Sequence, residues 1–200
     1  MADLLLDVLP GTVWEGRKIN SDFRPMVWLA NQYLRGAAEK DPLGFTLGAF
    51  QRFYGEEIPA PQSGEAFQSM LRFYAGGETA TPETRRSTAA GSHEIAFDYA
   101  SDASYIVAAF QQAYGIDLTC EKVHWWRFRA LFLGLPEDTL MHKIMHWRTA
   151  DLTAMSPEER RFYEERRELF ALPQGLKGGA PRAVSVAEHD AAFLARFQQR

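Results

Sequence analysis

Two histidines in the sequence have the spacing of a zinc site. His142 and His146 are four residues apart in "HKIMH", so on a helix they would share one face, as two zinc ligands do. A zinc protease also needs a glutamate directly after the first histidine to activate water. Lys143 occupies that position and would repel a cation, and no third histidine follows at a familiar spacing. We therefore expect both histidines to pack or to cap, and we expect no metal or other cofactor.

Other catalytic patterns are weaker still. Cys120 is the only cysteine, which excludes an intramolecular disulfide and a cysteine-based metal cluster, and His124 is the only base close to it in sequence. The chain has neither a serine nucleophile elbow nor a phosphate-binding glycine loop. Glu94, Asp98 and Asp102 surround an expected helix start, where caps and the helix dipole explain acidic residues. We expect a protein that is not an enzyme.

The stretch "KVHWWRFRALF", residues 122–132, alternates aromatic and basic residues. Such a pattern can mark a nucleic-acid surface, where bases stack on rings and cations follow phosphates, or a buried helix. On a helical wheel, one side holds Trp125, Phe128 and Phe132, and another holds Val123, Trp126, Ala130 and Leu133. The basic residues are divided between the two edges that separate these sides, instead of gathering on one face. The pattern therefore favours a core helix packed between neighbours.

Overall charge agrees with this interpretation. The formal net charge is -4 at pH 7, so the molecule as a whole does not attract nucleic acid or an anionic membrane. No apolar run approaches the roughly 18 residues of a membrane span. The N-terminal "MADLLLDVLPG" contains Asp3 and Asp7 where a secretory signal would be basic. We expect a cytoplasmic protein with neither nucleic acid nor membrane as a partner.

Regular start and stop signals predict a mainly α fold, a compact multi-helix bundle with a small N-terminal β-hairpin. The hairpin is expected within residues 12–20, around a Glu-Gly turn. Helices bounded by caps, glycines and prolines are expected within residues 23–36, 41–55, 64–77, 97–115, 117–134, 135–148 and 156–173. Residues 1–172 are expected to form one domain, in which the Gly-, Thr- and Ser-rich residues 76–94 are an exposed, mobile connection.

Residues 173–200 are expected to form a hinge and a short amphipathic C-terminal helix. Four apolar residues lie on or beside one side of its wheel: Val186, Phe193, Leu194 and Phe197. A helix this short is marginal alone in water, so its apolar side must dock on something. The glycine-rich hinge lets it reach its own domain, a second copy or another protein, and we take these four residues as the candidate partner-binding site.

Four stretches resemble a known family. "FDYASDASYIVAAFQQAYGIDL", "VHWWRFRALFLGLPEDT" and "IMHWRTADL" are similar to the central block of the bacteriophage gene-product-fifteen (Gp15) family, and the upstream "INSDFRPMVWL" is similar to its N-terminal pattern. The resemblance covers about residues 8–172. Members of that family occur in tailed phages and prophages of Gram-positive bacteria, typically encoded between the major tail protein and the tape-measure protein.

This resemblance implies a role by analogy with the tail assembly chaperones that are encoded in that position. The expected function is a non-enzymatic chaperone in the host cytoplasm that binds the tape-measure protein and assists tail-tube assembly. The major tail protein and a second copy of the chain are further expected partners. The alternative is a structural component retained in the virion; a nucleic-acid module and an enzyme rank below both.

Overall fold

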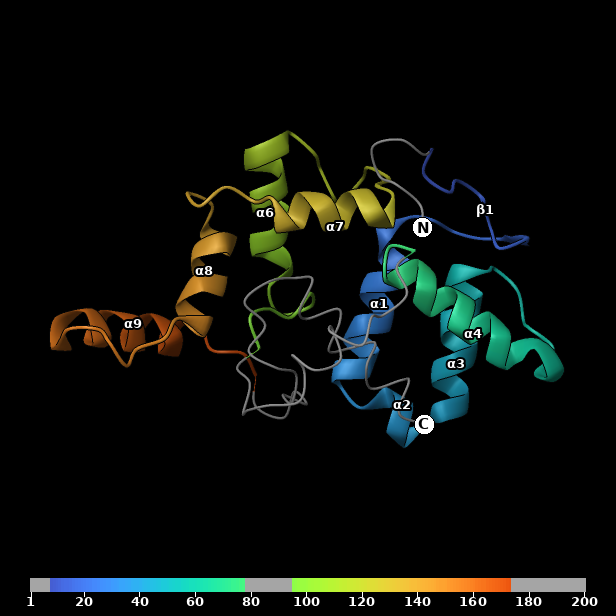
Figure 1. Ribbon diagram of the computed structural model, residues 1–200, viewed down its shortest axis with the longest axis horizontal. Coiled ribbons are helices and arrows are strands. Elements are labelled where there is room, and N and C mark those ends of the chain that lie inside the picture. Colours follow the sequence, from blue (N-terminus) through green and yellow to red (C-terminus); the bar gives the residue numbers. More distant parts are fainter. Residues whose placement is uncertain (1–7, 78–94, 174–200) are drawn as a thin grey trace.

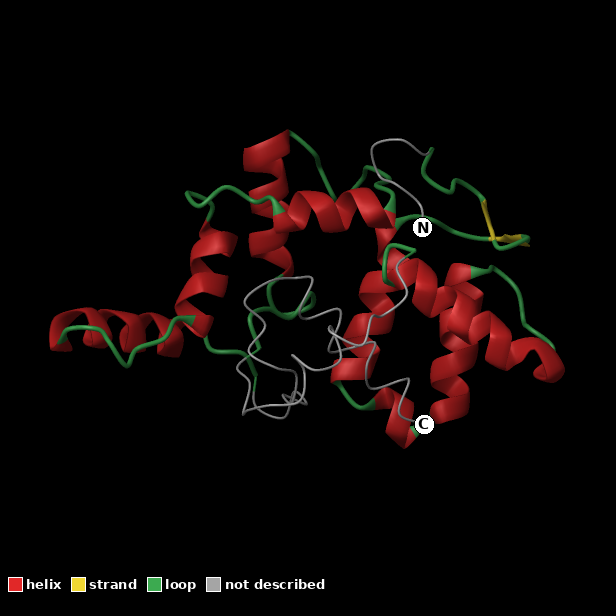
Figure 2. Ribbon diagram, viewed as in Figure 1, coloured by secondary structure: helices red, strands yellow, loops and turns green. Residues whose placement is uncertain are grey.

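The computed structural model describes residues 8–77 and 95–173. Within these residues the chain forms helices and one two-stranded hairpin, which confirms the mainly α prediction (Figure 2). The predicted C-terminal helix and most of the predicted connection, residues 78–94, lie outside the described residues.

The elements follow one another along the chain and pack as a series of neighbours. Their bounds are β1 Val13–Trp14, β2 Arg17–Lys18, α1 Phe23–Leu34, α2 Ala37–Lys40, α3 Pro42–Phe53, α4 Ala60–Tyr74, α6 Ala103–Tyr114, α7 Trp125–Leu133, α8 Leu140–Thr149 and α9 Pro157–Leu169. Helix α1 contacts α3 and α7, α6 contacts α8, and α8 contacts α9. Figure 1 shows the hairpin, α3 and α4 at one end of the molecule and α9 projecting at the other.

Three helix starts follow the local signals. The Asp22 carboxylate accepts from the Arg24 N–H at the start of α1, and Asp41 accepts from the Gly44 N–H at the start of α3. Ser156 and Glu159 form a capping box at the start of α9. Each cap satisfies N–H groups that have no partner within the helix, so these boundaries could be predicted from sequence.

The hairpin is fastened to α4. Glu15 and Gly16 have φ angles of 47° and 79°, which is typical of the turn that suits the right-handed twist of a two-residue hairpin. The Trp14 indole N–H donates to the Ser69 carbonyl at 3.1 Å. The Arg72 guanidinium donates to both carboxylate oxygens of Glu15, and this hydrogen bonding lowers the pKa of Glu15.

Helix α7 begins at Trp125, several residues later than the sequence predicted. The preceding residues pair with those that precede α1: the Phe23 N–H donates to the Val123 carbonyl at 2.9 Å, and the Trp125 N–H donates to the Ser21 carbonyl at 2.8 Å. This pairing joins segments about 100 residues apart. It holds His124 in an extended conformation. Residues 118–120 form a turn instead of a helix, and the Asp117 carboxylate accepts there from the Thr119 N–H and hydroxyl.

Three other starts differ from prediction. Helix α4 begins earlier, at Ala60. Helix α6 begins only at Ala103, because residues 95–98 have no regular secondary structure and residues 99–102 form turns. Helix α8 begins at Leu140 instead of near residue 135, because the buried Thr139 hydroxyl accepts from the His142 N–H and caps the helix there.

Helix α7 is a core helix, as predicted. Trp125, Phe128 and Phe132 are buried, and the Phe128 ring stacks on the rings of Phe23 and Phe110 with centroids 4.7 and 5.0 Å away. On the second predicted apolar side, Val123 and Trp126 are buried, whereas Ala130 and Leu133 are exposed. Helix α7 is therefore enclosed on both sides only near its N-terminus.

Candidate functional site

The two histidines with zinc-ligand spacing each make a hydrogen bond within the protein. His142 Nδ1 lies 3.0 Å from the Leu135 carbonyl oxygen, and His146 Nε2 lies 2.9 Å from the Tyr163 hydroxyl. The half-buried His142 therefore packs against the protein, as predicted, whereas His146 is exposed and contacts the Tyr163 side chain. Across residues 8–77 and 95–173, no group of three side chains that could hold a metal ion comes together.

Cys120 and His124 do not have the features of a nucleophile and its base. A hydrogen bond with the Asp117 side chain raises the pKa of the exposed Cys120 thiol, and the neighbouring carboxylates raise it further. A thiol shifted in that direction is less ionised at neutral pH and therefore less reactive. His124 has a structural role, because its Nδ1 accepts from the Trp126 N–H and its Nε2 lies 2.9 Å from the Pro10 carbonyl oxygen.

The role of His124 predicts a pH dependence of stability. Its Nδ1 must be unprotonated to cap α7, and burial lowers the pKa of His124, with the Pro10 carbonyl opposing this only in part. A lowered pKa in the folded state means that the unfolded chain binds the proton more readily. The free energy of unfolding should therefore decline as pH falls below about 6.5, the ordinary histidine pKa, and continue to decline down to the folded-state pKa. Urea unfolding between pH 7.5 and 5 measures this decline.

A His124→Asn variant is the matched control, since asparagine also caps helices well but does not titrate. The decline with pH should be shallower in this variant than in the unmodified chain. Equal declines in the two proteins would contradict a neutral His124 cap.

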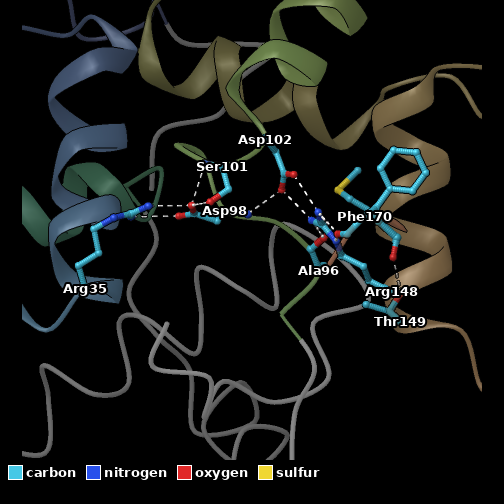
Figure 3. A network of polar contacts seen from close by, with 9 residues as sticks. Arg35, Ala96, Asp98, Ser101, Asp102, Arg148, Thr149 and Phe170 are labelled. Carbon is cyan, nitrogen blue, oxygen red and sulfur yellow. Dashed lines mark hydrogen bonds and ion pairs between the residues drawn. The ribbon is translucent and has the colours of Figure 1, made fainter. Parts of the chain in front are cut away.

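The most concentrated polar feature is a buried network around the segment that precedes α6 (Figure 3). Asp98, fully buried, accepts from the Arg35 guanidinium through both carboxylate oxygens at 3.2 and 2.9 Å. The Ser101 N–H and hydroxyl also donate to Asp98, at 2.8 and 2.6 Å. Burial alone would raise the pKa of Asp98, but the hydrogen bonds from Arg35 and Ser101 outweigh it and lower the pKa.

The second half of the network is an arginine–carboxylate pair between α8 and the start of α6. Arg148 donates to the two carboxylate oxygens of Asp102 at 2.7 and 2.9 Å, and the side chains are 8% and 2% exposed. Arg148 also donates to the carbonyls of Ala96 and Phe170. Asp102 in turn accepts from the Asp98 N–H at 2.9 Å, so the two pairs are joined.

This network stabilises the fold. Arginines and backbone N–H groups hold both carboxylates, and the lowered pKa of Asp98 leaves that carboxylate poorly suited to proton transfer. It connects α1, the segment before α6, α8 and the residue after α9 (Figure 3). The prediction that caps explain Asp98 and Asp102 is incomplete: Asp102 precedes α6 but makes no side-chain cap, and its main partner is Arg148.

Helix α9 forms a projecting arm with no buried residue. Its C-terminal end is held to α8 by Arg167, which donates to the carbonyls of Trp147 and Ala150, and by the bonds from Arg148 to the Phe170 carbonyl. Near the middle of the arm, Tyr163 contacts His146. The Trp147 ring of α8 also lies 6.4 Å from the Phe162 ring and stacks on the Phe170 ring at 5.5 Å. Helix α9 is therefore held on α8, while most of its surface faces solvent.

An apolar stripe runs along this arm. Phe162 and Leu169 are 44% and 65% exposed and seven residues apart, which places them on one side of the helix. Between them Arg166 lies against two rings, its guanidinium carbon 5.0 Å from the Phe162 centroid and 5.7 Å from the Trp147 centroid. We call Phe162, Arg166 and Leu169 the α9 stripe. It is the candidate interaction surface within the described part of the chain.

Comparison with known protein families identifies the chain. The family model described as "Bacteriophage Gp15 protein" matches residues 46–172, well over half of the sequence. The chain belongs to the bacteriophage Gp15 protein family. The comparisons with curated proteins and with solved structures gave no match.

Most of the candidate site lies within the part of this Gp15 protein that matches the family. The matched residues run from within α3 to the end of the arm, and they include Asp98, Asp102, Arg148 and the α9 stripe. Arg35 precedes them. The predicted partner-binding residues Val186, Phe193, Leu194 and Phe197 lie outside both the matched and the described residues. Among the described helices, none combines the length and hydropathy that crossing a membrane requires.

Proposed function

We propose that this Gp15 protein is a non-enzymatic tail assembly chaperone that acts in the cytoplasm of the bacterial host and binds the tape-measure protein. Membership of the phage family over residues 46–172 carries the proposal. The resemblance of its motifs to proteins encoded beside the tape-measure gene supplies the specific role, by analogy of gene position. A tape-measure protein is long and helical, so an amphipathic helix is a suitable element for binding it.

The chemistry of the described residues supports a binding protein more than a catalyst. His124, His142 and His146 each contact protein groups. The buried carboxylates Asp98 and Asp102 are paired with arginines. These residue types are the usual acids, bases and ligands of an active site, and here they serve structure.

We assign tape-measure binding to the apolar side of the C-terminal segment, formed by Val186, Phe193, Leu194 and Phe197. The major tail protein is the second proposed partner. Because large apolar side chains provide most of the energy in such contacts, loss of this side should weaken capture strongly. Nucleic acid is not a proposed partner, since the aromatic rings of α7 that could have stacked on bases are buried.

Co-expression with the tape-measure protein of the same phage tests this assignment. Truncation after Pro173 should reduce the amount of tape-measure protein captured in a pull-down by about tenfold or more, since loss of a hot spot costs about 2 kcal/mol or more and about 1.4 kcal/mol is already a tenfold change. A Leu43→Glu variant is the matched control, because Leu43 is an exposed apolar residue of α3 and does not belong to the C-terminal segment. Its capture should be unchanged. Equal capture by truncated and full-length chains would remove the C-terminal segment from the interface.

Mass spectrometry of purified virions separates the proposal from its alternative. A chaperone leaves when the tail is complete, so the protein should be absent from virions and present in lysates of infected cells. Stoichiometric amounts in the virion would instead establish a structural tail component.

A further inference from the structure

The α9 arm has an apolar stripe that the described residues cover only in part: the Trp147 ring of α8 lies 6.4 Å from the Phe162 ring, and Phe162 is still 44% exposed. A helix of 13 residues is marginal in water by itself, and this one packs on α8 along one side only, with no residue buried. Leu169 is 65% exposed on the side that also carries Phe162. An additional apolar element packed on this side would stabilise the arm and remove both side chains from water.

The chain itself contains an element of matching pattern. Phe162 and Leu169 are seven residues apart, and so are Val186 and Phe193, with Phe197 continuing the second series. Seven residues is close to two helical turns, so each series forms a line along one side of a helix. As helices, the line from Phe162 to Leu169 would span about 10 Å and the line from Val186 to Phe197 about 16 Å, so the longer line can cover the shorter one.

The connection between them is long enough for the segment to fold back. Residues 174–185 can extend about 40 Å, roughly twice the length of α9, and Gly175, Gly178 and Gly179 allow the chain to reverse. A short flexible tether also gives its end an effective concentration in the millimolar range. A second copy at micromolar concentration would compete poorly with such a tethered segment.

We propose that, in the free protein, residues 186–198 pack on the α9 stripe of the same molecule. Phe193 lies against Leu169 and Phe162 in this arrangement, with Val186 and Phe197 towards the two ends. The proposal concerns the unbound chain and stands independently of the tape-measure assignment. If that assignment also holds, the α9 stripe is the resting position from which the partner takes the segment.

The accessibility of position 169 tests this packing. In a Cys120→Ser background, which removes the one exposed native thiol, Leu169→Cys places a reporter on the stripe. Glu164→Cys places the control on the opposite, exposed side of the same helix. In the full-length chain, maleimide should label position 169 at least tenfold more slowly than position 164. Adding Phe193→Glu and Phe197→Glu should restore fast labelling at position 169 and leave position 164 unchanged.

The concentration dependence distinguishes the occupants. Packing within one molecule predicts the same protection at about 1 and 100 μM protein, whereas protection that grows over this range would assign the stripe to a second copy and overturn the proposal. Equal labelling of the two positions in the full-length chain would also overturn it, as would protection that survives the Phe193 and Phe197 substitutions. Far-UV circular dichroism of each variant establishes that the helices are intact. None of these outcomes depends on the tape-measure protein.

Discussion

Replacing Arg148 with methionine should lower the free energy of unfolding by about 3–5 kcal/mol, the usual effect of breaking a buried ion pair. Methionine keeps an apolar stem of similar length but removes the guanidinium that donates to both oxygens of Asp102. The Asp102 carboxylate would remain buried without its counter-charge, and the Ala96 and Phe170 carbonyls would lose a donor. Thermal unfolding should show a decrease in Tm of about 6–20 °C for a chain of this size.

Two further variants test whether the loss of stability comes from an uncompensated buried charge. Arg161→Met removes an exposed pair with Glu165 on α9, and because solvent screens such pairs, Tm should not change measurably. Combining Arg148→Met with Asp102→Leu removes both charges, so the double variant should be more stable than the Arg148→Met variant alone. A double variant that is less stable, by the sum of the two single effects, would contradict a dominant interaction between these side chains.

The sequence singled out Asp98 and Asp102 as acidic residues near a helix start, but it did not predict that they pair with arginines. Both aspartates precede a helix, where a cap is the ordinary explanation. Their partners Arg35 and Arg148 are 63 and 46 residues away. Nothing in the local pattern of either arginine distinguishes it from a solvated surface charge, because the pairing is decided by how α1 and α8 pack beside the segment between them.

Local signals and tertiary packing also explain which helix boundaries could be predicted from the sequence and which could not. Asp22, Asp41 and Ser156 cap the helices that follow them through bonds to residues two or three positions later, so the signal is contained in a few consecutive letters. Helix α7 also has a local cap, His124, but the position of its start depends in addition on backbone hydrogen bonds with Ser21 and Phe23, about 100 residues earlier. A tertiary contact of that range outweighs the weak local preference for helix.

The side of α7 that carries Ala130 and Leu133 shows what a helical wheel cannot predict. Periodicity indicates which residues share a side but not whether a neighbour covers it. The first turn of α7 is enclosed, because the Trp125 and Trp126 indoles donate to the Tyr74 and Phe73 carbonyls at the end of α4. Beyond that point α4 has ended, and Leu133 is 44% exposed.

The second large effect should follow replacement of Trp125 with alanine, which we expect to lower the free energy of unfolding by about 3–5 kcal/mol. Trp125 is 0% exposed. Its ring lies 5.1 Å from that of Tyr74 and 5.8 Å from that of Phe128, and its indole N–H donates to the Tyr74 carbonyl at 2.8 Å. Alanine would leave a cavity between α4 and α7 and deprive that buried carbonyl of its donor. Chemical denaturation followed by circular dichroism measures the change.

Two further variants, Trp125→Phe and Leu133→Ala, separate the contributions of the cavity and of the lost hydrogen bond to this loss of stability. Phenylalanine fills most of the cavity but cannot donate, so Trp125→Phe should have an intermediate cost that reports the lost hydrogen bond together with the small volume difference. Leu133→Ala removes an apolar side chain from the exposed end of the same helix and should have little effect, because that side chain already contacts water. If Trp125→Ala were as stable as Leu133→Ala, the ring could not be part of the core. The aromatic and basic residues of α7 would then have to be reconsidered as a nucleic-acid surface, which salt-dependent retention on DNA would reveal.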